Sequence, residues 1–200
     1  EIYRRLQAQD TSAVDYVFSW HGNADLIVAI IKLFEDLKNA ENDILEVGVQ
    51  AILLVEDSVR YYSTYLPELY KLVLKQSAEF LKETLNEHQR KFRKRSRPKI
   101  LLATNYDDAI SMYTKYKSNL LGVISDVGFT VHKEDRAEDE KLDAGIDLVR
   151  HIRQDDPFMP ILLQSSQESM ADIAKELGVG FLRKWSKTLM PQLSDYIGEE

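Results

Sequence analysis

Two hundred residues are enough for one or two domains, and 44% hydrophobic residues supply a substantial core. The absence of cysteine excludes a disulfide scaffold and a thiolate metal site, and favours a reducing compartment. The net charge of −7 argues against nucleic acid as the main partner, and no apolar run reaches the roughly 18 residues that span a bilayer. We therefore expect a cytoplasmic protein with no membrane segment.

The first forty residues predict a helix over residues 2–8, a strand over 14–18 and a helix over 24–39. Residues 17–20 align with residues 182–185 near the other end of the chain, and an amphipathic helix follows both segments. We interpret residues 1–40 as the C-terminal part of a preceding, degenerate domain of the same kind, and residues 41–48 as a linker. Because the chain begins without methionine in a helix-like stretch, we expect it to be part of a longer protein.

From residue 49 onward strands and helices alternate. The predicted strands are residues 49–55, 99–104, 120–125, 160–164 and 180–183, and the predicted helices are residues 59–85, 107–117, 145–153, 168–177 and 188–197. This alternation predicts right-handed crossovers and a five-stranded parallel sheet with helices on both faces. The first helix is unusually long, and Pro67 could kink it or begin a second segment.

A basic segment separates this long helix from the second strand. Residues 86–99 hold seven lysines and arginines against the single acid Glu87. A helix tail or solvated connector is the simplest interpretation, and docking to an acidic partner is the alternative.

Polar residues follow four of the predicted strands. Glu56 and Asp57 come after the first, Asp126 after the third, Ser165 after the fourth and Lys184 after the fifth. The carboxyl ends of parallel strands share one edge where ligands bind, so these side chains can meet there. Carboxylates are suitable ligands for Mg²⁺, and hydroxyl and ammonium groups bind phosphoryl oxygens.

Each of these residues has an alternative reading. Glu56 and Asp57 could cap the next helix, because carboxylates favour its positive end, and Asp126 could be an ordinary acid at a strand end. Ser166 competes with Ser165, although the strand register favours Ser165. The competitors of Lys184 are Arg183 and Lys187, and strand alternation allows only one residue of a consecutive pair to face a given side.

The ordered runs LLVEDS, VISD, LLQSS and FLRK resemble the receiver domain of two-component response regulators, over residues 49–200. The resemblance implies a flavodoxin-like sheet of strand order 2-1-3-4-5. It also implies that Asp126 accepts a phosphoryl group from a histidine kinase or phosphotransfer protein, and that Ser165 and Lys184 bind the phosphoryl oxygens. By the same resemblance, Mg²⁺ is held by Glu56, Asp57, Asp126 and the Gly128 carbonyl, and Phe181 is the switch aromatic that responds together with Ser165.

Three features depart from the receiver pattern. Residues 130–144 form a long acidic loop, residues 60–98 form an extended first helix with a basic connector, and Trp185 follows Lys184 where receivers usually have proline. Two such units in tandem resemble the N-terminal part of bacterial phosphoenolpyruvate synthase-like proteins. An output domain in the same chain and a homodimer are both compatible with the resemblance.

Two other function classes compete with a working receiver. A pseudo-receiver would keep the fold and serve as a regulatory interaction module, possibly for a phosphoenolpyruvate synthase-like enzyme. A Mg²⁺-dependent phosphatase would need a second acid shortly after its aspartyl nucleophile, and Val127, Gly128 and Phe129 cannot serve. We therefore expect a phosphoacceptor domain and not an enzyme.

Overall fold

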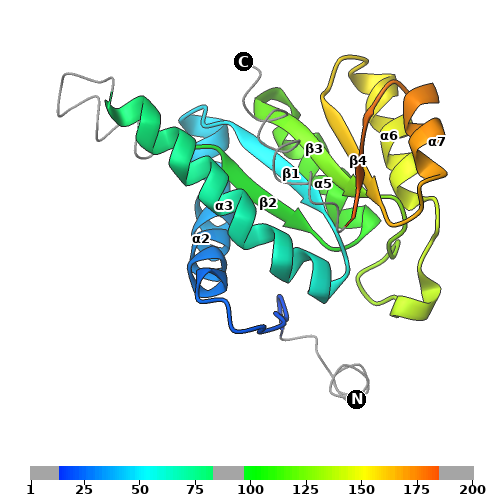
Figure 1. Ribbon diagram of the computed structural model, residues 1–200. Helices are drawn as coiled ribbons and strands as arrows, with labels where there is room; N and C mark the ends of the chain where they lie inside the picture. The colour runs from blue at the N-terminus through cyan, green and yellow to red at the C-terminus, as the bar shows by residue number, and fades with distance from the viewer. Residues whose placement is uncertain (1–13, 83–96, 185–200) are drawn as a thin grey trace.

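The computed structural model describes residues 14–82 and 97–184, and these form an α/β unit built on one parallel sheet (Figure 1). The strand order is β2-β1-β3-β4-β5, and every neighbouring pair is parallel. The predicted order is confirmed. The strands, nearly all buried, are β1 (Ala51–Val55), β2 (Lys99–Ala103), β3 (Leu120–Asp126), β4 (Ile161–Ser165) and β5 (Gly180–Arg183).

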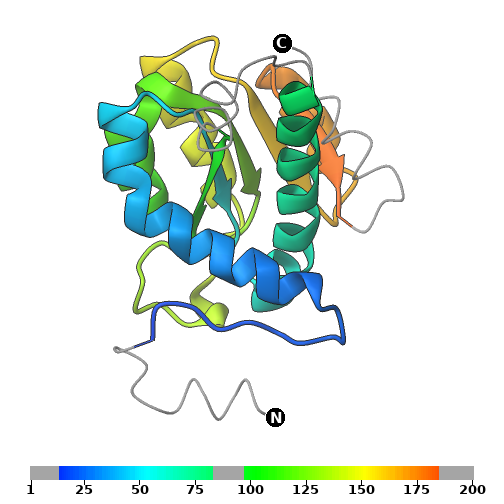
Figure 2. The ribbon, with the colours of Figure 1, turned by 90° about the vertical axis from the view of Figure 1, so that its left-hand side faces the viewer.

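Helices cover both faces of the sheet, as the alternating pattern predicts (Figures 1 and 2). On one face α3 (Val59–Lys82) and α2 (Asp25–Ala40) pack side by side over Ile52, Leu54 and their neighbours. The other face, centred on Leu53 and Val123, is covered by α5 (Tyr106–Tyr116), α6 (Ala144–Asp155) and α7 (Met170–Glu176). Burial on both faces explains the continuous apolar runs of the strands.

The long first helix of the predicted domain is a single helix. α3 extends over 24 residues with Pro67 inside it, so Pro67 neither ends it nor starts a second segment. Leu66 and Leu69, on either side of the proline, are fully or almost fully buried against the sheet. This packing compensates for the backbone hydrogen bond that proline cannot donate.

The predicted strand at residues 14–18 is wrong. These residues have an irregular conformation and cross α3, where the Ser19 N–H donates to Ser63 Oγ at 2.9 Å. The Tyr16 hydroxyl donates to the Leu102 carbonyl of β2 at 2.9 Å. The aromatic side chains that suggested a strand pack on this face instead, with the Phe18 and Tyr62 rings 5.6 Å apart. Local alternation cannot distinguish these outcomes, because the pairing depends on a neighbouring strand that is absent here among the described residues.

The helix predicted at residues 24–39 is confirmed as α2, and a π-helical turn, Glu41–Glu46, continues it. Its buried residues Ala29 and Leu33 contact the same core as α3. That residues 1–40 end a preceding domain stays a prediction. The described part of this segment packs directly on the sheet of residues 51–183.

Arg97 and Lys99 correct the view of the basic segment as a solvated connector. Both side chains are buried, and the guanidinium of Arg97 donates to Asp36 of α2 at 2.6 and 2.9 Å. Asp36, fully buried, also accepts from the Tyr70 hydroxyl at 2.9 Å and from the Ile100 N–H at 3.1 Å. The end of this segment therefore fastens α2 to the amino end of β2.

Several expectations lie outside the described residues. They are the helices at 2–8 and 188–197, most of the basic segment, and the surroundings of Trp185 and Lys187. Within the described residues, no helix is both long and apolar enough to cross a membrane.

Candidate functional site

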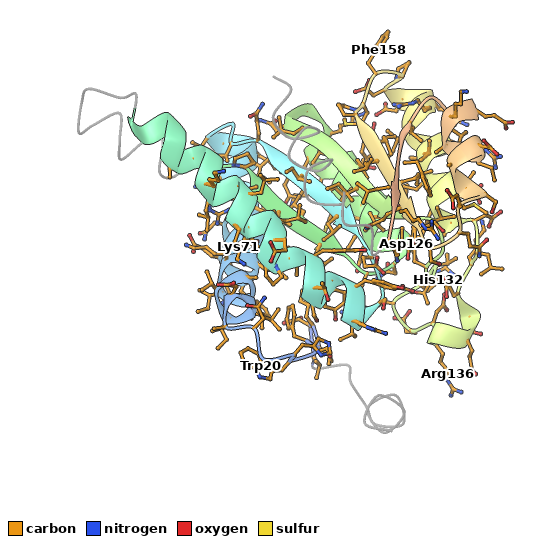
Figure 3. The ribbon with its side chains drawn as sticks, viewed as in Figure 1. Trp20, Lys71, Asp126, His132, Arg136 and Phe158 are labelled. Atoms are coloured by element: carbon orange, nitrogen blue, oxygen red, sulfur yellow. The ribbon has the colours of Figure 1, made fainter. Side chains whose placement is uncertain are left out.

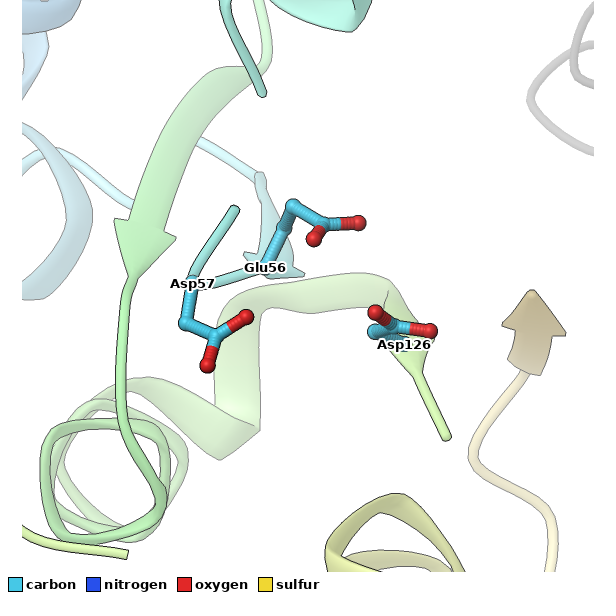
Figure 4. Close-up of side chains that lie close together, drawn as sticks. All are labelled: Glu56, Asp57 and Asp126. Carbon is cyan, nitrogen blue, oxygen red and sulfur yellow. The ribbon is translucent and has the colours of Figure 1, made fainter. Parts of the chain in front are cut away.

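Three carboxylates meet at the carboxyl edge of the sheet (Figure 4). Glu56 and Asp57 directly follow β1, and Asp126 is the last residue of the neighbouring β3. One oxygen from each carboxylate lies within 4.8 Å of the others. Figure 3 places Asp126 at this edge, whereas Phe158, which precedes β4, lies at the other end of the sheet. The parallel topology thus brings together acids that are about 70 positions apart in the sequence.

Backbone N–H groups hold the three carboxylates in place. The Val127 N–H donates to Asp126 Oδ1 at 2.8 Å, and the Thr130 N–H donates to Asp57 Oδ2 at 3.1 Å. The Ser58 N–H donates to Glu56 Oε1 at 3.2 Å, next to the start of α3. Glu56 therefore does bond near the helix start, as the capping alternative predicts, but its second oxygen is turned into the site.

Lys184 provides the cation of the site. It follows β5, and its backbone N–H donates to the Ser165 carbonyl at 3.0 Å. Its buried ammonium lies 2.8 Å from Glu56 Oε2 and donates to Asp126 Oδ2. Arg183, in contrast, is exposed and pairs with Glu168 at 3.0 Å. Strand alternation thus selects Lys184 over Arg183, as expected.

Burial and mutual repulsion make the acids reluctant to ionise. Burial raises the pKa of Glu56 well above its usual range, and the Asp126 charge raises it further. Burial also raises the pKa of Asp57, to about 6. It raises the pKa of Asp126 as well, although the nearby Lys184 ammonium lowers that pKa in part. Burial alone would lower the pKa of Lys184, but the charges of Glu56 and Asp126 outweigh it and raise the pKa.

This donor set fits a hard divalent cation such as Mg²⁺. All three side chains offer carboxylate oxygens, the ligand type that Mg²⁺ prefers. Glu56 Oε2 is buried, and the Lys184 ammonium lies 2.8 Å from it. A buried carboxylate oxygen this close to two other acids is suited to a metal ligand.

A pocket of about 150 Å³ opens beside Asp126 and Lys184. Ser165, Ser166 and Gly128 also line it, so both candidate serines reach the site. Ser165 is buried and its Oγ accepts the Gln167 N–H at 3.1 Å, whereas Ser166 is exposed. The pocket is thus bordered by an acid, a hydroxyl and an ammonium, the groups needed to hold a phosphoryl group.

Gly145, at the start of α6, lets this helix approach the Asp126 backbone. A Cβ at this position would overlap the Asp126 carbonyl oxygen and lie 3.0 Å from the Val127 Cα. The Gly145 N–H donates to the Val127 carbonyl at 2.9 Å. The close contact fixes the backbone on which the Asp126 side chain stands.

Phe181 lies in β5 beside Leu163 of β4 and packs, half-buried, against the core under α5, α6 and α7. It is not among the residues that line the pocket. Its role as a switch aromatic stays a prediction.

The sequence pattern missed two side chains of the site. The Lys184 ammonium lies 3.8 Å from the centroid of the Tyr61 ring, which also lines the pocket. Glu140, from the long acidic loop, lines the same pocket. Tyr61 could have been found from its place in the first turns of the helix after Glu56 and Asp57. Glu140 was one of several loop acids, and no local signal distinguishes it.

No family model matches the chain, and no curated protein matches it. Among solved structures, it is similar to a response regulator receiver domain protein from Clostridium thermocellum, at 19% identity and a TM-score of 0.45, over 76% of this chain and 93% of that one. It is also similar to a chain of the CheX–CheY–BeF3–Mg²⁺ complex from Borrelia burgdorferi, at 16% identity and a TM-score of 0.46, over 78% of this chain and 92% of that one.

Proposed function

We propose that this chain is a phosphoacceptor receiver in phosphorelay signal transduction, and that Asp126 takes a phosphoryl group from a histidine kinase or a phosphotransfer protein. The observation that carries the proposal is the convergence of Glu56, Asp57 and Asp126 on one space, with Lys184 paired to two of them. A carboxylate surrounded in this way can attack phosphorus once the surrounding charge is neutralised.

The charge balance supports a requirement for a divalent cation. Ionisation of all three acids beside one ammonium would leave the site net negative, and this charge would repel an anionic phosphoryl donor. Bound by Glu56, Asp57, Asp126 and the Gly128 carbonyl, Mg²⁺ would supply the missing positive charge and a contact for a phosphoryl oxygen.

The remaining groups of the site are suited to hold the transferred phosphoryl group. The Lys184 ammonium, now shared between Glu56 and Asp126, would pair with one phosphoryl oxygen. The Ser165 hydroxyl, at the rim of the same pocket, would donate to another. Movement of Ser165 toward the phosphate would then allow Phe181 to turn, a packing change that an output domain or partner could recognise.

The main rival is a pseudo-receiver that keeps the fold as an interaction module. The Lys184 contacts with Glu56 and Asp126 would then serve only to neutralise buried acids. Glu56 Oε2 is buried and lies close to oxygens of the other two acids, a position suited to a metal ligand, and this favours a working site. A link to a phosphoenolpyruvate synthase-like enzyme stays a prediction from the sequence.

Incubation with acetyl phosphate tests the proposal. With Mg²⁺, intact mass spectrometry should show the addition of one phosphoryl group that hydroxylamine removes, and EDTA should prevent the addition. Asp126→Asn should abolish it, whereas Asp172→Asn, on the exposed surface of α7, should leave it unchanged. An unmodified mass in the presence of Mg²⁺ would favour the pseudo-receiver.

A further inference from the structure

The long acidic loop after β3 returns to the site through a backbone bridge. Phe129 and Lys141 form an isolated antiparallel pair, in which each N–H donates to the carbonyl of the other at 3.2 and 3.1 Å. The Phe129 side chain is fully buried and stacks on Tyr106, with the ring centroids 6.5 Å apart. The bridge therefore fixes the position of residue 140 relative to the residues that follow Asp126.

Glu140 uses this position to reach Gly128, two residues after Asp126. A Cβ built on Gly128 would overlap Glu140 Oε1 and lie 3.5 Å from the carboxyl carbon. Glu140 thus occupies the space that a side chain at position 128 would take. It lines the pocket together with Asp126 and Lys184.

Two neighbouring acids of the loop form ion pairs with residues of the same loop, and Glu140 is not part of these pairs. Glu138 pairs with Arg136 at 3.5 Å, and Asp143 lies 3.9 Å from the Lys141 ammonium. No ion pair among the described residues involves Glu140. Its exposed side chain lines the pocket beside Asp126 and Lys184. The carboxylate is therefore directed to the pocket and not to the loop that carries it.

A carboxylate at this place is chemically meaningful. Hydrolysis of an aspartyl phosphate is accelerated by a group close to the phosphoryl group that accepts a proton from the attacking water. The chain at residues 127–129 offers only apolar side chains and a glycine. The bridge supplies from the loop the acid that the chain following Asp126 lacks.

We propose that Glu140 is the general base for hydrolysis of the acyl phosphate formed on Asp126, so that this site limits the lifetime of its own signal. This inference rests on the proposed function. In the step, the water oxygen forms a bond to phosphorus while the bond between phosphorus and the Asp126 oxygen breaks. The water proton passes to the Glu140 carboxylate and then to solvent, leaving inorganic phosphate and a free Asp126 carboxylate.

The test is the decay of the acyl phosphate after the phosphodonor is removed by gel filtration, followed by quenching and intact mass spectrometry. Glu140→Gln keeps the shape of the side chain but cannot accept the proton, so we expect decay roughly 10- to 100-fold slower than in the wild type. Glu138→Gln, in the same loop, should decay at the wild-type rate. Formate should accelerate decay in Glu140→Ala, because a small carboxylate can replace the missing base.

Gly128→Ala gives an independent check that leaves Glu140 in the chain. The added methyl group displaces the flexible end of Glu140 and spares the backbone, so decay should slow with little loss of stability. Equal decay rates in the wild type and Glu140→Gln would overturn the role of Glu140 and leave the proposed function standing. Absence of any acyl phosphate on the wild type would overturn the proposed function, and this role with it.

Discussion

Two clusters of buried charge lie at opposite ends of the sheet and differ in their balance. At the amino end of β2, Asp36 and Asp43 face Arg97 and Lys99, with Lys99 2.6 Å from Asp43. At the carboxyl edge three acids meet, and Lys184 pairs with two of them, Glu56 and Asp126. The first cluster has two acids, two cations and further hydrogen bonds to Asp36, whereas the second has three acids and one cation. The balanced cluster is suited to stabilise the fold, and the cluster with more acids than cations is suited to bind a cation.

Removal of Asp36 should have the largest effect on stability. Asp36→Ala leaves the Arg97 guanidinium and the Lys99 ammonium buried beside one remaining acid, and breaking a buried pair in this way costs about 3–5 kcal/mol. We expect this loss in the free energy of unfolding measured with urea. Asp25→Ala, which breaks the exposed pair with Lys71, should cost less than about 1 kcal/mol. Similar losses of unfolding free energy in both variants would contradict a special role of the Asp36 cluster in stability.

Magnesium should stabilise the protein in a pH-dependent way. The pKa of Asp57 is about 6 in the folded protein, above its ordinary value of 3.8. Without metal, the folded state therefore binds more protons between these values, and the free energy of unfolding falls as pH rises, by at most about 3 kcal/mol for this group. Since Mg²⁺ competes with protons, it should raise Tm more at about pH 7.5 than at about pH 5.

Thermal denaturation followed by circular dichroism, at matched ionic strength, measures this effect. Choline chloride in place of magnesium chloride should not reproduce the shift. A rise in Tm of the same size at both pH values would mean that the carboxyl-edge acids do not bind the metal.

Neutralising an acid at the carboxyl edge should have the opposite sign to the Asp36 variant. Glu56→Gln replaces a buried acid, whose pKa is strongly raised, with a neutral side chain of the same shape. The free energy of unfolding without metal should therefore increase by about 1–2 kcal/mol. The gain in Tm from Mg²⁺ should be lost. Glu46→Gln, on the exposed end of the π-helical turn, is the control and should change neither value. Destabilisation by Glu56→Gln would show that both clusters stabilise the fold.

The ring under Lys184 should have the smallest effect. Tyr61→Leu removes the cation–π contact and the stacking on Tyr65, and should lower the free energy of unfolding by about 0.5–1 kcal/mol. Tyr61→Phe keeps the ring and should stay close to the wild type. Chemical denaturation of the three proteins separates these outcomes, and equal losses in both variants would point to the hydroxyl group instead.

The sheet and the strand-end acids could be predicted because both follow from local patterns. Continuous apolar runs predict buried parallel strands, and parallel strands share a carboxyl edge, so Asp57 and Asp126 could be placed together from the sequence. The same logic separated Lys184 from Arg183, since neighbours in a strand face opposite sides.

The features that the sequence did not reveal depend on contacts between distant segments. Residues 14–18 alternate like a strand, yet they pack on α3. Arg97 and Lys99 read as solvated until Asp36 of α2 is placed beside them. Glu140 reaches the pocket only because the bridge between Phe129 and Lys141 closes the loop.

The most direct test of the central claim is to locate the phosphoryl group after reaction with acetyl phosphate and Mg²⁺. Borohydride reduction converts an aspartyl phosphate to homoserine, and tandem mass spectrometry identifies the position. We predict homoserine at position 126 and at no other acid, including Asp36 and Asp43 of the balanced cluster. Homoserine at another position, or its complete absence, would contradict the assignment of the carboxyl edge as a phosphoacceptor site.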